Sequence, residues 1–257
     1  DLAIVVGGDG TVREAAGGVA ARDVVNDSPP ILIVPAGTEN LLARHLKIPS
    51  DARQMANLLH AGREVQFDEL QIDNGSYVST FLIVAGMGFD ARVVRALAAS
   101  RRGHIDYASY FWPLWRTFWS YRHPRLTVEA DGRIIHEGPG LVFVGGIPRY
   151  ALGLRILDQS GAADGLLDVC MFECRHTCNL FRHALNVLLR RHPRSPCCAY
   201  TRAATVVIWS DEPCDVQLDG DWALELSGRQ PGEADRVGTT VIFNSTGRRV
   251  RFLAPAV

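Results

Sequence analysis

Residues 1–12 of this 257-residue chain read DLAIVVGGDGTV. The apolar run Leu2–Val6 predicts a short strand buried on both faces, and the alanine-rich stretch 11–21 predicts a helix. Between them, Gly7 and Gly8 allow the backbone to take positive φ and to approach a ligand closely. Their N–H groups and the start of the helix form a concavity suited to phosphate oxygens. The stretch therefore predicts a phosphate-binding turn, with a plain strand-to-helix turn as the alternative.

Two polar residues of this turn point to the kind of phosphate. Asp9 would repel a phosphate unless a cation lies between them, so its presence implies Mg²⁺ between the protein and a nucleotide. The hydroxyl of Thr11 can donate to a phosphate oxygen. The turn therefore favours a nucleotide that carries its own magnesium ion.

A second turn of the same kind follows the apolar strand predicted at residues 31–34. In PAGTEN (residues 35–40), Pro35 stops the strand, Gly37 opens the turn, Thr38 offers a hydroxyl and Asn40 can cap the next helix. A capping role alone for these polar residues is the alternative. Because the carboxyl ends of parallel strands meet at one crevice, both turns are expected to face the same ligand.

The pattern changes near residue 65. The first part alternates strands and helices, including a helix over 51–61, which is typical of a parallel α/β sheet. The second part has short β segments separated by Gly-containing turns, with Asp73-Asn74-Gly75 as a hairpin signal. Helices over 105–121 and 176–191 interrupt it. We therefore expect an α/β nucleotide-binding domain over 1–64 and an antiparallel β-sandwich-like domain with helices over 65–257, and leave open whether the last residues return to the first domain.

Composition restricts the function classes. A formal net charge of −1 argues against a general nucleic-acid binder. No apolar run approaches the roughly 20 residues that span a bilayer, and the first residues lack the features of a signal peptide. The abrupt start with a strand predicts that an earlier segment lies outside this chain.

The six cysteines lack Cys-x-x-Cys spacing, which favours free thiols in a reducing compartment over a disulfide framework. A zinc site is the alternative. Its ligands would come from Cys170, Cys174, Cys178, His176 and His183.

Five segments, in this order, resemble the lipid kinases with a diacylglycerol kinase catalytic domain, a family that includes bacterial diacylglycerol kinase-like enzymes, sphingosine kinases and ceramide kinases. They are VVGGDGTV (5–12), PAGTENLLARHL (35–46), VAGMGFDARVV (84–94), ADGLLDV (163–169) and VQLDGDW (216–222). The resemblance implies an incomplete N-terminal domain of the NAD kinase and phosphofructokinase type, a β-rich C-terminal domain, and an active site between them. It also implies ATP, Mg²⁺ and a lipid acceptor at a membrane surface.

The resemblance assigns site residues by position. The nucleotide-binding set is Gly7, Gly8, Asp9, Gly10, Thr11, Val12, Arg13, Gly37, Thr38, Asn40, Asp68 and Asp221. Within it, Asp9 and Asp68 are linked to the nucleotide magnesium through water, whereas Leu41 stands where the family usually has a third acid. Asp219 becomes the general base toward the lipid hydroxyl, with Asp9 as the second catalytic residue. Asp221, where the family has Glu, has a supporting role.

The segment GAADGLLDV resembles a structural magnesium site of some bacterial members. By position, its ligands would be the Asp164 carboxylate and the carbonyls of Gly161 and Leu166. A loop of ordinary turn residues is the alternative.

The lipid side of the prediction depends on the aromatic stretch over 105–125, which either contacts a membrane interface or packs as a core helix. Arg190, Arg191 and Arg194 form a small basic cluster that could add membrane attraction.

The sequence therefore predicts an ATP- and Mg²⁺-dependent lipid kinase that phosphorylates a hydroxyl of diacylglycerol or a related lipid. It would be cytoplasmic and peripheral at the membrane, with no nucleic-acid partner and an open oligomeric state. An NAD kinase-like enzyme and a non-catalytic nucleotide- or lipid-binding member are the alternatives.

Overall fold

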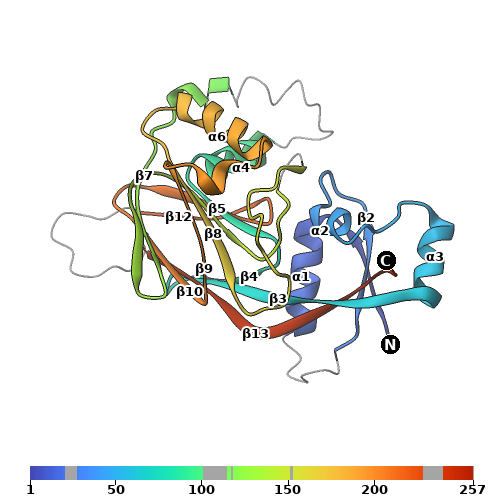
Figure 1. The fold of residues 1–257 in the computed structure, drawn as a ribbon. Helices are drawn as coiled ribbons and strands as arrows, with labels where there is room; N and C mark the ends of the chain where they lie inside the picture. The colour runs from blue at the N-terminus through green and yellow to red at the C-terminus, as the bar shows by residue number, and fades with distance from the viewer. Residues whose placement is uncertain (21–27, 101–114, 117, 151–152, 228–239, 257) are drawn as a thin grey trace.

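The structure is a computed structural model that describes residues 1–20, 28–100, 115–116, 118–150, 153–227 and 240–256 (Figure 1). Its helices are α1 (Asp9–Ala20), α2 (Leu41–His45), α3 (Ala52–Ala61), α4 (Phe89–Ser100), α6 (Cys178–Leu188) and the 3-10 helix η2 (His192–Arg194). Its strands are β1 (Ala3–Gly7), β2 (Ile31–Pro35), β3 (Gly62–Asp73), β4 (Val78–Phe81), β5 (Val84–Met87), β6 (Arg125–Ala130), β7 (Arg133–Gly145), β8 (Leu167–Glu173), β9 (Cys198–Ala203), β10 (Thr205–Ser210), β11 (Cys214–Leu218), β12 (Asp221–Leu226) and β13 (Thr240–Pro255).

The N-terminal part is an α/β unit, as predicted. Strands β1 and β2 pair in parallel, with Ala3 opposite Ile31 and Gly7 opposite Pro35. Parallel neighbours require a crossover connection, and α1 lies within it. The two glycine-containing turns therefore sit at the same edge of the sheet.

The prediction that the first strand is buried on both faces is wrong. Ala3 and Val5 pack against the core, whereas Ile4 and Val6 are 58% and 63% exposed. Helix α1 covers one face of β1, and the other face is open in the part of the chain that the structure describes. A continuous apolar run does not reveal which of its faces is covered.

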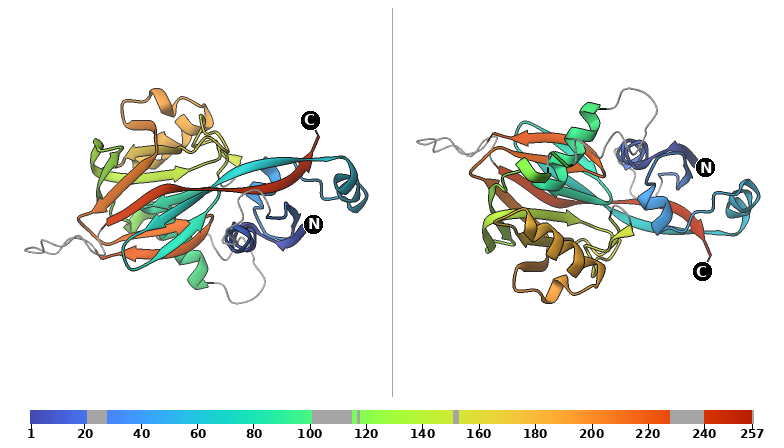
Figure 2. Two further views of the ribbon diagram at one scale, coloured as in Figure 1. Left: turned by 90° about the horizontal axis from the view of Figure 1, so that it is seen from below. Right: turned by 90° about the horizontal axis from the view of Figure 1, so that it is seen from above.

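Two long strands join the N-terminal and C-terminal parts. Strand β13 pairs antiparallel with β3, from Ile242 opposite Asp73 to Pro255 opposite Gly62, and Phe252 also pairs in parallel with β2. Figure 2 shows the two strands running side by side between the parts. The predicted domain boundary between residues 64 and 65 falls inside β3, and this boundary stays a prediction.

The C-terminal part is antiparallel and β-sandwich-like, as predicted. Its central strand order is β10-β6-β7-β5-β11-β12, with β8 and β9 continuing from β7. Helices α4 and α6 lie outside the strands (Figure 1). The predicted hairpin is confirmed, because β3 and β4 pair antiparallel around Gly75, whose φ is +83°.

The helix predictions hold with shifted bounds. Helix α1 begins at Asp9 rather than at residue 11, and the predicted helix over 176–191 corresponds to α6, which ends at Leu188 before the separate 3-10 helix η2. The predicted helix over 105–121 lies mostly outside the described residues. None of the helices that the structure describes is long and apolar enough to cross a bilayer.

Candidate active site

The two glycine turns touch each other backbone to backbone. The Ala36 N–H donates to the Gly7 carbonyl over 3.0 Å. A Cβ atom added to Gly37 would lie 2.5 Å from the Cα of Gly8, so a side chain at this position has no room. The sequence prediction that both turns face one crevice agrees with this contact.

Asp9 links the first turn to the helix that follows the second turn. Its Oδ2 accepts from the Leu41 N–H at 2.9 Å, and its Oδ1 accepts from the Leu42 N–H at 3.1 Å. These N–H groups have no partner within α2, so the carboxylate caps that helix. Burial raises the pKa of Asp9, and the two N–H donors oppose this shift.

The prediction that Asn40 caps the helix with its side chain is wrong. Its Oδ1 accepts from the Gly37 N–H at 2.9 Å and its Nδ2 donates to the Gly37 carbonyl at 2.7 Å, so the side chain closes its own turn. Asn40 adopts positive φ, at +48°, a conformation that Asn tolerates better than most residues. The cap comes from Asp9 instead, which no local pattern around α2 could reveal.

The third component is the turn between β11 and β12. Asp219 and Gly220 both have positive φ, at +51° and +88°, as a two-residue hairpin of type I′ requires. The Asp219 carboxylate accepts from the N–H groups of Leu82, Ile83 and Val84 at 2.9–3.0 Å. Burial raises the pKa of Asp219 to about 6. The three N–H donors and the positive charge of Arg13 lower this pKa and so offset part of the effect of burial.

Arg13 connects α1 to this hairpin. One guanidinium nitrogen donates to the Leu218 carbonyl at 2.8 Å, and the other lies 3.6 Å from an oxygen of Asp221. Asp221 also lies close to Gly10, where an added Cβ would be 2.3 Å from its carboxylate. The N-terminal helix and the C-terminal hairpin therefore form opposite walls of one site.

A cavity of about 670 Å³ lies between these walls, within the usual size range of small-molecule sites. Its lining contains Gly8, Asp9, Gly10, Thr11, Arg13, Glu14, Gly37, Thr38, Glu39, Asp219, Gly220 and Asp221. Of the predicted residues, Gly7, Val12, Asn40 and Asp68 are absent from this lining. Glu14, Glu39 and Gly220 were missed, although each is adjacent to a predicted residue.

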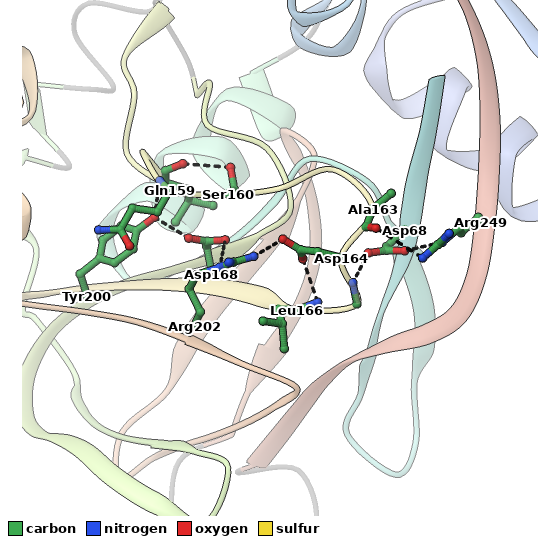
Figure 3. A network of polar contacts seen from close by, with 12 residues as sticks. Asp68, Gln159, Ser160, Ala163, Asp164, Leu166, Asp168, Tyr200, Arg202 and Arg249 are labelled. Carbon is green, nitrogen blue, oxygen red and sulfur yellow. Dashed lines mark hydrogen bonds and ion pairs between the residues drawn. The ribbon is translucent and has the colours of Figure 1, made fainter. Parts of the chain in front are cut away.

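Asp68 lies in a different network, shown in Figure 3. Its carboxylate accepts from the Gly165 N–H at 2.6 Å and lies 3.4 Å from Nε of Arg249. Its own N–H donates to the Ala162 carbonyl at 2.7 Å. Asp68 therefore ties β3 to the loop over 161–166 and to β13, and its nucleotide role stays a prediction.

The same network contains the residues assigned to a structural magnesium ion. The Asp164 carboxylate pairs with the guanidinium of Arg202, and its Oδ1 accepts from the Leu166 N–H at 3.1 Å. Arg202 also lies 3.4 Å from the fully buried Asp168, which accepts from the Tyr200 hydroxyl at 2.5 Å. The Asp164 carboxylate is therefore already paired with a guanidinium, and the assignment of Asp164 and of the Gly161 and Leu166 carbonyls to a structural magnesium ion stays a prediction.

Other metal sites gain no support. All six cysteines are free thiols, and the described residues contain no group of three or more His, Cys, Asp or Glu side chains placed to hold an ion. For nucleotide magnesium the residue types do fit, because Asp9 and Asp221 are among the residues that line the cavity and Mg²⁺ prefers oxygen ligands such as carboxylates.

Arg202→Ala is expected to lower the free energy of unfolding by about 1–3 kcal/mol, because it leaves the buried Asp168 and its neighbour Asp164 without a cation. Chemical denaturation measures the free energy of unfolding of the variant and of the wild type. The control is Arg175→Ala, which removes an exposed pair with Glu173 and is expected to cost less than about 1 kcal/mol. Equal losses in the two variants, or a wild-type midpoint lowered by EDTA without nucleotide, would contradict the role given to Arg202.

Comparison with known proteins agrees with this arrangement. The diacylglycerol kinase catalytic domain family matches residues 1–72, and the YegS C-terminal NAD kinase beta sandwich-like domain matches residues 83–237. A diacylglycerol kinase of Bacillus subtilis (strain 168) is 27% identical over 235 residues, which cover 91% of this chain and 74% of that protein. A diacylglycerol kinase of Staphylococcus aureus (strain JH9) is 22% identical, over 88% of this chain and 70% of that protein.

A solved structure from Bacillus anthracis str. Sterne shares the fold. It superposes with a TM-score of 0.69 at 21% identity, covering 99% of this chain and 77% of the other. With both domain families matched in order over most of its length, the chain belongs to the diacylglycerol kinase family, a family of lipid kinases, with a YegS-type C-terminal domain.

Proposed function

We propose that the protein transfers the γ-phosphate of ATP to a hydroxyl group of diacylglycerol or a related lipid. The observation that carries this proposal is the cavity that residues of the two glycine turns line together with Asp219, whose carboxylate is buried. Family membership supports a lipid acceptor, and the 27% identical relative is a diacylglycerol kinase.

The N-terminal wall suits the nucleotide. Backbone N–H groups at the start of α1 and hydroxyls of Thr11 and Thr38 line the cavity and can donate to phosphate oxygens. Arg13 adds a positive charge beside them. When bound with ATP, Mg²⁺ would neutralise phosphate charge beside Asp9 and Asp221.

The C-terminal wall suits the acceptor. Phosphoryl transfer leaves the protein mainly positioning, charge stabilisation and one proton transfer. Burial raises the pKa of Asp219 to about 6, which makes its carboxylate a stronger base than that of an exposed aspartate. It would take the proton of the lipid hydroxyl as the hydroxyl oxygen bonds to the γ-phosphorus and the bond to ADP breaks. Its three backbone donors fix the carboxylate in place.

The test is an assay with radiolabelled ATP, MgCl₂ and a mixture of lipids, with NAD supplied separately as an acceptor. A labelled lipid phosphomonoester is expected. Labelled NADP would favour the NAD kinase-like alternative, and ATP binding without any transfer would favour a non-catalytic member.

The pH dependence follows from Asp219. The base acts only when deprotonated, so kcat is expected to fall as pH decreases through about 6. Asp90, which binds Tyr150 and Gln217 outside the cavity lining, is a second carboxyl whose pKa burial raises to about 6. A kcat–pH profile of Asp90→Asn distinguishes the two carboxyls. If Asp219 causes the fall of kcat at low pH, this fall persists in the variant. If kcat of Asp90→Asn no longer falls at low pH, the pH dependence would be assigned to Asp90 instead.

A further inference from the structure

Helix α6 has an apolar face that points away from the protein. Phe181, Leu185, Leu188 and Leu189 follow the i, i+4, i+7 and i+8 spacing of a single helix face, and they are 49–68% exposed. His183 and Val187, on the opposite face, are buried. A surface helix normally carries polar residues on its outer side. Contiguous apolar surface of this kind marks a site of interaction with a partner or a membrane.

Aromatic side chains extend this face. Phe118 packs edge-on against Phe181, with ring centroids 5.0 Å apart. Next to it, Trp115 and Trp119 are about half exposed, and their rings lie 5.6 Å apart. We call Phe181, Leu185, Leu188, Leu189, Trp115 and Trp119 the α6 face. Tryptophan beside leucine and phenylalanine is typical of surfaces that enter the interface of a bilayer.

The charge around the α6 face indicates which partner it fits. Residues 174–210 contain no Asp or Glu. The exposed arginines of this segment are Arg175, Arg182, Arg190, Arg191 and Arg194. Basic residues beside an apolar face attract anionic lipid headgroups. A second copy of the chain fits less well, because a symmetric contact would bring these like charges together.

The α6 face is also connected to the proposed acceptor side of the active site. Phe118 contacts Phe89 at the start of α4, with ring centroids 5.9 Å apart. Helix α4 packs on β11 and β12, whose turn carries Asp219. Val94 and Ala98 of α4 line a small cavity together with Asp221 and Trp222. The helices on this side of the β-sandwich therefore link the α6 face to the catalytic hairpin (Figure 1).

We propose that the α6 face is the surface with which the protein docks on an anionic lipid bilayer. The proposal rests on the proposed function in one respect, since docking serves to reach a lipid acceptor held in a membrane. The apolar side chains would enter the headgroup region while the arginines contact lipid phosphates.

The experiment uses the full protein and the double variant Leu185→Ser/Leu188→Ser. Co-sedimentation measures binding to vesicles of phosphatidylcholine with phosphatidylglycerol, and to vesicles of phosphatidylcholine alone. The wild type is expected to prefer the anionic vesicles, and the double variant to lose about tenfold or more in partitioning. The control is Leu59→Ser, which changes a similarly exposed leucine of α3 and is expected to bind like the wild type.

A charge variant, Arg182→Glu/Arg190→Glu, tests the electrostatic part, and its binding to anionic vesicles is expected to fall and to lose salt dependence. Both positions are exposed, so folding is expected to be retained, which thermal melting checks. Unchanged vesicle binding in both variants would overturn the proposal. A wild-type dimer that the leucine variant dissociates, with vesicle binding intact, would assign the α6 face to self-association instead.

The docking and kinase proposals fail in different ways. With a short-chain, water-soluble diacylglycerol, the leucine variant is expected to keep the wild-type rate, and with vesicle-bound diacylglycerol it is expected to lose activity. Equal rates on vesicles would overturn docking and leave the kinase proposal intact. No transfer to either substrate by the wild type would overturn the proposed function, while vesicle binding alone would still decide the docking surface.

Discussion

Asp219→Asn is expected to reduce kcat for lipid phosphorylation by about 10²–10⁴-fold, the usual contribution of a positioned general base. The amide cannot take the proton of the acceptor hydroxyl. ATP affinity is expected to stay near the wild-type value, because the glycine turns that we propose to hold the nucleotide lie on the other wall of the cavity. Steady-state kinetics and equilibrium ATP binding measure the two effects separately.

Structural damage must be distinguished from lost chemistry, since three backbone N–H groups donate to this carboxylate. Thermal unfolding of Asp219→Asn detects such damage. The matched control is Glu225→Gln, which changes a partly exposed carboxylate on β12, outside the cavity lining, and is expected to reduce kcat far less. Retained turnover in Asp219→Asn, or equal losses in both variants, would remove Asp219 from the role of base.

Gly37→Ala is expected to have the second largest effect. The added Cβ would meet the Cα of Gly8 at 2.5 Å, and backbone atoms cannot rotate away as a flexible side chain can. The two turns must separate, which costs about 1–3 kcal/mol for overpacking of this kind. Because the separation displaces the N–H groups that we propose as phosphate donors, ATP binding is expected to weaken together with stability.

Gly18→Ala is the matched control for Gly37→Ala. Gly18 lies on the exposed side of α1, and no atom lies within 4 Å of an added Cβ. Alanine is a better helix former than glycine, so this variant is expected to be up to about 1 kcal/mol more stable, with unchanged ATP affinity. Calorimetric ATP titration compares the variants, and wild-type affinity in Gly37→Ala would contradict the proposed nucleotide site.

Local patterns were enough to predict the units that build the cavity. The strand–glycine turn–helix stretch at residues 3–20, the second turn after β2, and the hairpin at Asp73-Asn74-Gly75 all appear where the sequence places them. In each case, a few adjacent residues determine the backbone conformation through glycine, proline or an Asx interaction. The Asp219-Gly220 turn belongs to the same group, because both positions need positive φ.

Contacts between distant residues could not be predicted in this way. Asp9 caps a helix that begins 32 residues later, and Arg13 reaches the Leu218 carbonyl across 205 residues. Arg202 lies on β9, far along the chain from the carboxylate of Asp164 that it neutralises. Sequence periodicity carries no information on such pairs, so side-chain roles inferred for Asn40, Asp68 and Asp164 did not include their actual partners.

Phosphate transfer from ATP to a lipid hydroxyl, in the cavity between the glycine turns and the Asp219 hairpin, can be followed directly. The most direct measurement follows the full protein by phosphorus NMR with ATP, MgCl₂ and a short-chain diacylglycerol. A lipid phosphomonoester is expected to appear in equal amount with ADP in the wild type, and both signals are expected to form about 10²–10⁴-fold more slowly with Asp219→Asn. ADP formed without any phosphorylated lipid, or a lipid phosphomonoester formed at the wild-type rate by Asp219→Asn, would contradict the proposed function.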